Sequence, residues 1–282
     1  MYASTSQFED FETSSVRSPH QRVDAAAAVS LKHDGRSTRL DRLFQQGSAK
    51  IRFPKNHDDQ TEAVLINTAG GLTGGDSLSW DVDLSPDCSA VVTTQACEKS
   101  YRSASGTARV QTSLRLQANS ILHWLPQETI LYEGSQLART FDVEIGENAE
   151  LLALESVMLG REAMGEKIET VQFHDRWRVS RNGRLIFADD LRLSDNEKTI
   201  SKLNGNLALA SLLFVSPQDE ECLLKIVQKL RDACHNTVSG FSAFDGKITG
   251  RILASGTYEL RQALVPVMRL LRNADLPRVW RI

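Results

Sequence analysis

Residues 108–117 read ARVQTSLRLQ, and two chemically different series interleave in this stretch. The even positions carry Ala, Val, Thr, Leu and Leu, and the odd positions carry Arg, Gln, Ser, Arg and Gln. Because successive side chains of a strand point to opposite faces, the pattern predicts a strand with one buried and one solvated face. Residues 78–84 and 141–145 repeat it. Period two dominates the sequence to about residue 201, so the chain is expected to be mostly β.

Other segments are apolar at both alternating series of positions. They are AVLINT at 63–68, AVVTT at 90–94 and LLALESVML at 151–159. Such segments indicate strands that are covered on both faces, as in stacked sheets. Asn182-Gly183 and Asp245-Gly246 each lie between two strand-like runs and predict two-residue hairpin turns.

Helical periodicity is found only near the C-terminus. Ser216 as the cap residue and Pro217 at the first helical position predict a helix near 217–235. A second helix is expected over 258–272, where Pro266 would kink or split it. The expected fold is therefore mostly β (α+β), with stacked, largely antiparallel β-sheets and two C-terminal α-helices.

The chain is expected to contain one domain. Residues 1–30 have no usable hydrophobic period and are interpreted as a flexible N-terminal leader, although the alanine run at 25–28 is a candidate start of the first strand. Residues 31–282 are assigned to a single β-rich domain. No repeat of 20 to 50 residues is visible.

Composition excludes several classes of protein. Lys plus Arg number 33 against 36 for Asp plus Glu, which gives a formal net charge of −3 and no basic surplus for nucleic acid. No apolar run approaches the roughly 18 residues needed to span a bilayer, so no membrane association is expected. The N-terminus lacks the features of a cleaved signal, and the four cysteines are scattered. We therefore expect a reduced cytoplasmic protein.

The densest local feature is residues 67–76, NTAGGLTGGD, in which four glycines fall within six positions. A phosphate-binding loop would need a following Lys-Ser/Thr pair and a helix, and neither is present. An enzyme that uses this loop as an anion site is the weakest alternative. The glycines are better explained by turns and close strand approach, which leaves the role of Asp76 open.

Acidic residues lie in or beside apolar strands. A buried carboxylate needs an ion-pair partner, water or a metal. One interpretation pairs these acids with Lys99, Arg102 or Arg161 as structural ion pairs, and the other lines a wet interior path with them. The acids concerned are Glu98, Glu128, Glu155 and Glu162.

The sequence carries no recognised catalytic motif. It has no Gly-x-Ser-x-Gly elbow, no His-Glu-x-x-His and no Cys-x-x-Cys, and its six histidines are dispersed. His174-Asp175 and Cys234-His235 are interpreted as surface or cap chemistry, and Cys97 is a marginal soft-ligand candidate. No enzymatic activity and no tightly bound cofactor are expected.

Five motifs in order resemble the UreD (also called UreH) family of urease accessory proteins. They are NTAGGLTGGD at 67–76, TTQACEKSYRS at 93–103, LPQETILYEGS at 125–135, LESVMLGREAMGE at 154–166 and PRVWR at 277–281. Cys97 stands where the family pattern suggests a small residue, so no family role is assigned to it. The resemblance runs from about residue 31 to the end, with 198–250 only weakly characteristic.

The resemblance implies a non-catalytic protein that joins a UreF-type protein and, through it, a UreG-type GTPase. The assembly would dock on apo-urease and assist GTP-dependent insertion of nickel, which is in transit and not a resident cofactor. It also implies an internal tunnel, for whose lining we nominate the acids at matching motif positions. These candidates are Asp76, Glu98, Glu128, Glu155 and Glu162.

Two hypotheses remain open. In the first, carboxylates guide nickel, because they exchange it faster than imidazole and thiolate ligands. In the second, the chain is a structural adaptor that bridges its partners without contacting nickel. Arg278, Trp280 and Arg281 are predicted to bind a partner, since Trp and Arg are typical of interface hot spots. The alternative is that Trp280 packs on the helix of Leu264 and Met268.

Overall fold

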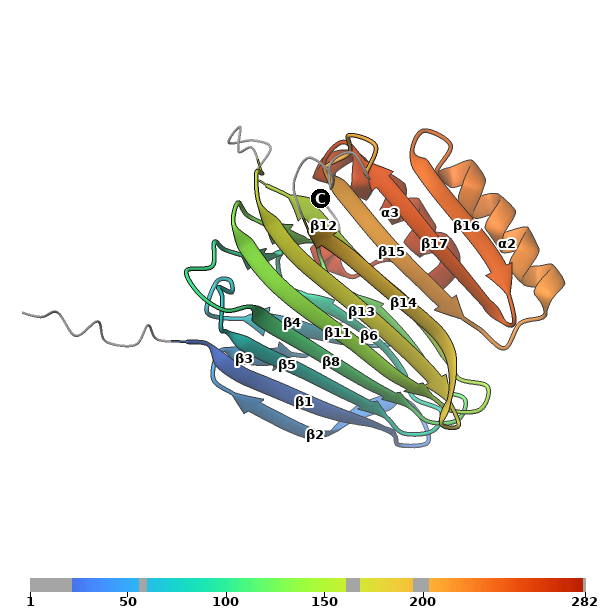
Figure 1. The fold of residues 1–282 in the computed structure, drawn as a ribbon. Helices are drawn as coiled ribbons and strands as arrows, with labels where there is room; N and C mark the ends of the chain where they lie inside the picture. The colour runs from blue at the N-terminus through green and yellow to red at the C-terminus, as the bar shows by residue number, and fades with distance from the viewer. Residues whose placement is uncertain (1–21, 56–59, 161–167, 195–202, 281–282) are drawn as a thin grey trace, which may run out of the picture.

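The computed structural model describes residues 22–55, 60–160, 168–194 and 203–280. Two stacked β-sheets fill most of the molecule, and two helices cover one end of the second sheet (Figure 1). The prediction of a mostly β fold with stacked sheets and two C-terminal helices is confirmed.

The first sheet has seven strands in the order β14-β13-β11-β8-β5-β1-β2. Their bounds are β1 Asp24–His33, β2 Thr38–Gln46, β5 Ser77–Leu84, β8 Ala108–Leu116, β11 Ser135–Ile145, β13 Val171–Arg181 and β14 Arg184–Ser194.

The second sheet has ten strands, eight of which follow the order β16-β17-β15-β12-β9-β6-β4-β3. Short strands β7 and β10 pair with each other, and β10 also pairs with β12. The bounds are β3 Ala49–Arg52, β4 Thr61–Asn67, β6 Ser89–Thr94, β7 Glu98–Ser100, β9 Ile121–Leu125, β10 Thr129–Leu131, β12 Glu150–Leu159, β15 Ala208–Val215, β16 Val238–Phe244 and β17 Lys247–Ala254.

The prediction of largely antiparallel sheets is wrong. From β4 to β13 the chain crosses repeatedly from one sheet to the other. When it comes back to a sheet, the new strand runs in the same direction as the previous strand of that sheet. The neighbours β1–β5–β8–β11–β13 and β4–β6–β9–β12 are consequently parallel. Antiparallel pairs occur at β1–β2, β3–β4, β13–β14, β12–β15, β15–β17 and β16–β17. Alternation in the sequence reports which face is buried and carries no information on strand direction.

Both predicted hairpin turns are present. Asn182 and Gly183 have φ of 52° and 73° between β13 and β14, and Asp245 and Gly246 have 46° and 71° between β16 and β17. Two successive positive φ values are what a type I′ turn requires, which explains the Asn-Gly and Asp-Gly pairs.

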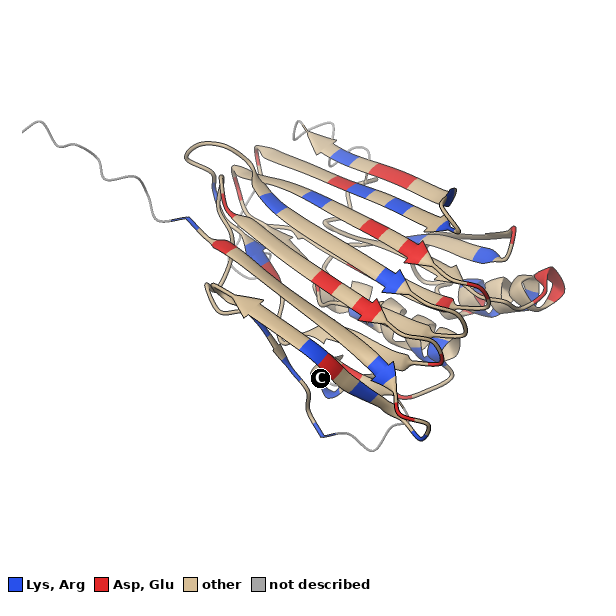
Figure 2. Ribbon diagram, turned by 90° about the horizontal axis from the view of Figure 1, so that it is seen from below, with Lys and Arg blue, Asp and Glu red and all other residues tan. Residues whose placement is uncertain are grey.

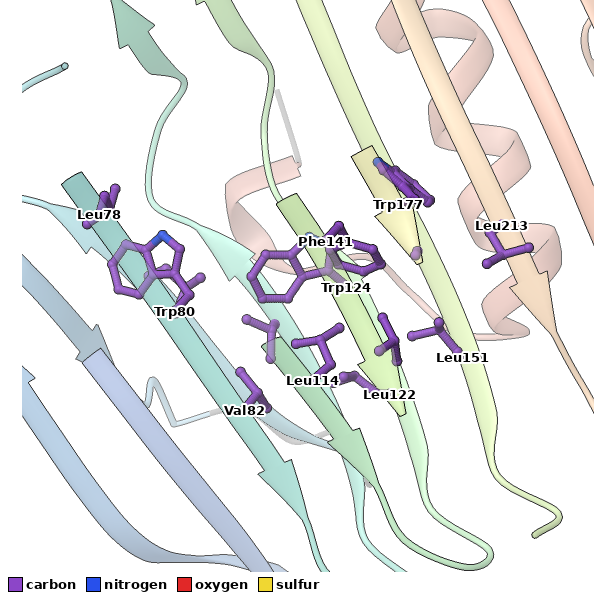
Figure 3. Close-up of a cluster of buried hydrophobic side chains, with 14 of the residues drawn as sticks. Leu78, Trp80, Val82, Leu114, Leu122, Trp124, Phe141, Leu151, Trp177 and Leu213 are labelled. Atoms are coloured by element: carbon purple, nitrogen blue, oxygen red, sulfur yellow. The ribbon is translucent and has the colours of Figure 1, made fainter. Parts of the chain in front are cut away.

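The main core lies between the two sheets. Figure 3 shows Trp124 of the second sheet beside Phe141 of the first, with Trp177 next to Phe141; the ring centroids are 6.0 and 4.8 Å apart. Each aromatic or branched side chain that is fully buried contributes about 1.5–3 kcal/mol. Charged residues recur along the neighbouring strands of the seven-stranded sheet (Figure 2). Asp83 and Arg115, which alternate with buried positions of β5 and β8, form an ion pair on the face away from the core. The alternation seen in residues 108–117 corresponds to these two faces.

A second core lies between the ten-stranded sheet and helices α2 (Glu220–Ala233) and α3 (Thr257–Arg272). The capping residue of α2 is Asp219, whose side chain accepts a hydrogen bond from the backbone N–H of Cys222. Ser216 is therefore not the cap, and the helix begins three residues after Pro217. Helix α3 runs unbroken through Pro266, so the proline does not split it.

The predicted leader is too long at its C-terminal end. Strand β1 begins at Asp24, and its buried positions start at Ala25, so the alanine run belongs to the first sheet. Residues 1–21 lie outside the described residues. Among the helices of the described ranges, none has the length and apolar character to cross a membrane.

Candidate functional site

A buried charged cluster joins the two sheets. Arg139 of β11 donates to Glu155 of β12 at 2.5 Å and to Asp175 of β13 at 2.6 Å. The indole N–H of Trp124 donates to the other oxygen of Glu155 at 2.8 Å. Burial raises the pKa of the Glu155 carboxyl above its ordinary value, although the Arg139 guanidinium acts to lower it. The cluster thus contains two carboxylates and one guanidinium.

The cluster faces a cavity of about 210 Å³ between the sheets. Strands of both sheets contribute to its lining, and exposed residues of the loops at Gly70 and at Gln95 and Ala96 also border it. Its polar lining includes three carboxylates, from Glu98, Glu155 and Asp175. A space of this size, with polar groups on its walls, is large enough for several water molecules.

Glu98, in β7, is bound near one side of this cavity. Its side chain accepts from the amide of Asn67 at 3.1 Å and from the backbone N–H of Lys99 at 3.0 Å. Burial raises the pKa of the Glu98 carboxyl, and these hydrogen bonds partly oppose the rise. Glu98 therefore lines the cavity, and its hydrogen bonds come from an amide and a backbone N–H group.

Glu128 lies outside the cavity lining and is fully buried. Its two oxygens each accept a hydrogen bond of 2.6 Å from Arg261 of α3. The thiol of Cys97 contacts the same carboxylate at 3.4 Å, and burial together with this charge raises the pKa of the thiol to about 11. The raised pKa disfavours the thiolate, which is the metal-binding form of a cysteine.

Asp76 closes the glycine-rich loop. Its two oxygens accept from the backbone N–H groups of Val23 at 2.9 Å and Thr73 at 2.8 Å. Gly74 packs so tightly that an added Cβ would lie 2.5 Å from the carbonyl oxygen of Gly106. The loop is thus a tightly packed turn, as the glycine interpretation predicts.

The predicted acids are only partly brought together. Glu98 and Glu155 line one cavity, Glu128 and Asp76 are not in its lining, and Glu162 lies outside the described residues. Nowhere in the described ranges do three His, Cys, Asp or Glu side chains form a group that could hold a metal ion.

Two residues of the cluster were missed from the sequence, Arg139 and Asp175. The signal was present, because period two places Arg139 with Leu137 and Phe141, and Asp175 with Phe173 and Trp177, on the buried face of their strands. Reading His174-Asp175 as a surface pair is therefore wrong for Asp175, which is 3% exposed.

Two of the three predicted partner-binding residues lie within the described ranges, and these two differ in exposure. Trp280 is 3% exposed, and its indole N–H donates to the carbonyl of Leu125 at 3.0 Å. It packs in the second core with Leu264 and Met268, so it is a core residue and not an exposed hot spot. Arg278 is exposed, and Arg281 lies outside the described residues.

Comparison with known proteins identifies the same family that the sequence motifs resemble. The family model described as UreD urease accessory protein matches residues 23–281. The urease accessory protein UreD of Rhizobium leguminosarum bv. viciae is 46% identical over 268 residues, which cover 93% of this chain and 96% of that protein. The urease accessory protein UreD of Mesorhizobium japonicum is 47% identical over 252 residues, covering 88% and 89%.

Proposed function

This chain belongs to the UreD family of urease accessory proteins, and from that membership we propose that it guides nickel into apo-urease. Membership gives it a role in urease maturation. In the proposal it acts in the cytoplasm as a non-enzymatic scaffold, bound to a UreF-type protein and through it to a UreG-type GTPase. Hydrolysis of GTP elsewhere in the assembly releases the nickel ion that this chain conducts.

The observation that carries the proposal is the carboxylate-lined cavity between the sheets. A conduit must admit its ion and also release it. Carboxylates, carbonyls and water hold Ni²⁺ more loosely than imidazole and thiolate do, and Glu98, Glu155 and Asp175 are the acids of the cavity wall. Their negative charge favours cations over anions. The partner surface in this proposal includes the exposed Arg278, together with Arg281.

The test is nickel loading of urease by a chain whose cavity acids are neutral. Glu98→Gln and Glu155→Gln are combined, because glutamine keeps the volume and removes the charge. The variant is co-expressed with urease and its accessory proteins, and nickel per urease active site is measured. We expect nickel to fall well below the parent value while the accessory proteins still co-purify. The matched control is Glu144→Gln, on the solvent face of β11.

The adaptor hypothesis is the second candidate, and a specific observation favours it. Glu128 and Asp76, two of the nominated acids, have both oxygens occupied by Arg261 or by backbone N–H groups. Because these two acids also lie outside the cavity lining, they serve the fold. If the Glu98→Gln, Glu155→Gln variant loads urease as fully as the parent chain, the adaptor explains the family role and the conduit does not.

A further inference from the structure

Arg139 occupies an unusual place for an arginine in a proposed cation path. It lies in the wall of the cavity, and its side chain is only 9% exposed. The guanidinium also lies 5.0 Å from the centre of the Phe173 ring, so it is held on one face by an aromatic side chain. One cation of the protein itself thus sits between the acids that would receive the travelling ion.

The hydrogen bonds of the cluster leave few free carboxylate positions. Glu155 receives Arg139 on one oxygen and Trp124 on the other. Asp175 receives the Nη2 of Arg139 at 2.6 Å on Oδ2 and its Nε at 3.3 Å on Oδ1. A cation entering the cavity must therefore compete with charge-assisted hydrogen bonds before it can bind either acid.

We propose that Arg139 is a positioning residue that holds Glu155 and Asp175 apart from the passing ion, so that the cavity conducts nickel and does not store it. This inference rests on the function proposed above. With both carboxyls ionised, the two carboxylates and one guanidinium leave one negative charge, which attracts a divalent cation. The guanidinium prevents both acids from closing on that cation together.

Removal of the guanidinium reverses this balance. Two carboxylates from neighbouring regions of the wall, Glu155 and Asp175, then share a buried space with no cation between them. Such a pair is unfavourable when empty and gains most from a divalent ion. Loss of Arg139 should thus raise the affinity for Ni²⁺ and at the same time reduce its delivery.

The experiment measures binding of Ni²⁺ alone to the purified full chain by calorimetry, and nickel per urease active site after co-expression. For Arg139→Met we expect the Kd for Ni²⁺ to fall by about tenfold, because the ion no longer competes with the guanidinium for the two carboxylates. We also expect nickel per urease active site to decrease. Arg139→Lys keeps the positive charge but cannot make the forked hydrogen bonds to both acids, so its Kd should lie between those of the parent and Arg139→Met. An Arg139→Met chain that binds Ni²⁺ no more tightly than the parent would overturn the inference.

A second pair of variants guards against failure to fold. Asp175→Asn is compared with the double variant Arg139→Met, Asp175→Asn, which removes one charge of each sign. The two chains differ only at Arg139, so tighter Ni²⁺ binding by the double variant supports the inference and equal binding refutes it. Failure of the conduit itself has a different signature, because urease would then load fully even without the charges of Glu98 and Glu155.

Discussion

Charged side chains are buried in two regions, between the sheets and beneath the helices, and their surroundings differ in the two regions. Between the sheets, Glu155 is 10% exposed and borders a cavity. Beneath α3, Glu128 is 0% exposed and both its oxygens are held by Arg261. The first arrangement places a carboxylate in the wall of a cavity, and the second encloses it. The comparison separates acids that border the cavity from acids that are enclosed by the fold.

The largest effect is expected from the aromatic packing between the sheets. Trp177→Ala removes a side chain that is 1% exposed and packs on Phe141, so it should lower the free energy of unfolding by about 3–5 kcal/mol. Denaturant unfolding of the purified chain measures this. A loss below about 1 kcal/mol would mean that this region is not the main core.

The enclosed ion pair beneath α3 should follow closely. Arg261→Met leaves the fully buried Glu128 without its partner, and the expected loss of unfolding free energy is about 3 kcal/mol. Arg139→Met should cost less than this, because Glu155 keeps the Trp124 hydrogen bond and both Glu155 and Asp175 border a cavity that is large enough for water. Parallel unfolding curves compare the two variants, and an equal or larger loss for Arg139→Met would contradict the distinction between the regions.

A histidine beneath the helices should make the free energy of unfolding depend on pH. Burial lowers the pKa of the His123 imidazole below its ordinary 6.5, against the influence of Glu150, while Arg272 adds to the lowering. The folded state therefore binds this proton less readily than the unfolded chain. Neutral His123 makes its full contribution to the free energy of unfolding above about pH 6.5, and this contribution is lost as the pH falls through the folded-state pKa.

His123→Asn tests this by removing the titrating group. Its free energy of unfolding should depend less steeply on pH below 6.5 than that of the parent chain, as measured by unfolding at a series of pH values. Identical slopes would show that His123 titrates alike in the folded and unfolded states.

The smallest effect is expected on the solvated face of the seven-stranded sheet. Asp83→Asn breaks the 2.6 Å ion pair with Arg115, but the two side chains are 39% and 57% exposed. Surface pairs of this kind contribute about 0–1 kcal/mol, and salt screens them. A change above about 1 kcal/mol in thermal or denaturant unfolding would contradict the assignment of this face to solvent.

The sequence predicted correctly which face of a strand is buried, but it did not predict whether neighbouring strands run parallel or antiparallel. The alternation in residues 108–117 identified the buried and solvated sides of β8, and both Gly-containing turns were found from two residues each. Parallel pairing was missed because it arises from how the chain crosses between sheets, which no local pattern records. Trp280 was ambiguous for a similar reason, since its buried partner Leu125 is 155 residues away.

The candidate site was predicted in part because motif position and spatial position differ. Glu98 and Glu155 border the cavity, whereas Asp76 closes a turn and Glu128 anchors α3. Arg139 and Asp175 follow the same period-two rule as their apolar neighbours. They could have been identified by asking which charged residues fall on buried faces.

The most direct measurement of the central claim fills the cavity and leaves its charges in place. Thr112 of β8 lines the cavity, and the next residue, Ser113, lies on the opposite face of the same strand. Thr112→Phe and the control Ser113→Phe are each co-expressed with urease and its accessory proteins, and nickel per urease active site is determined on complexes that still assemble. We predict that Thr112→Phe lowers nickel loading severalfold while Ser113→Phe leaves it unchanged. Full loading by an assembled Thr112→Phe complex would contradict passage of nickel between the two sheets.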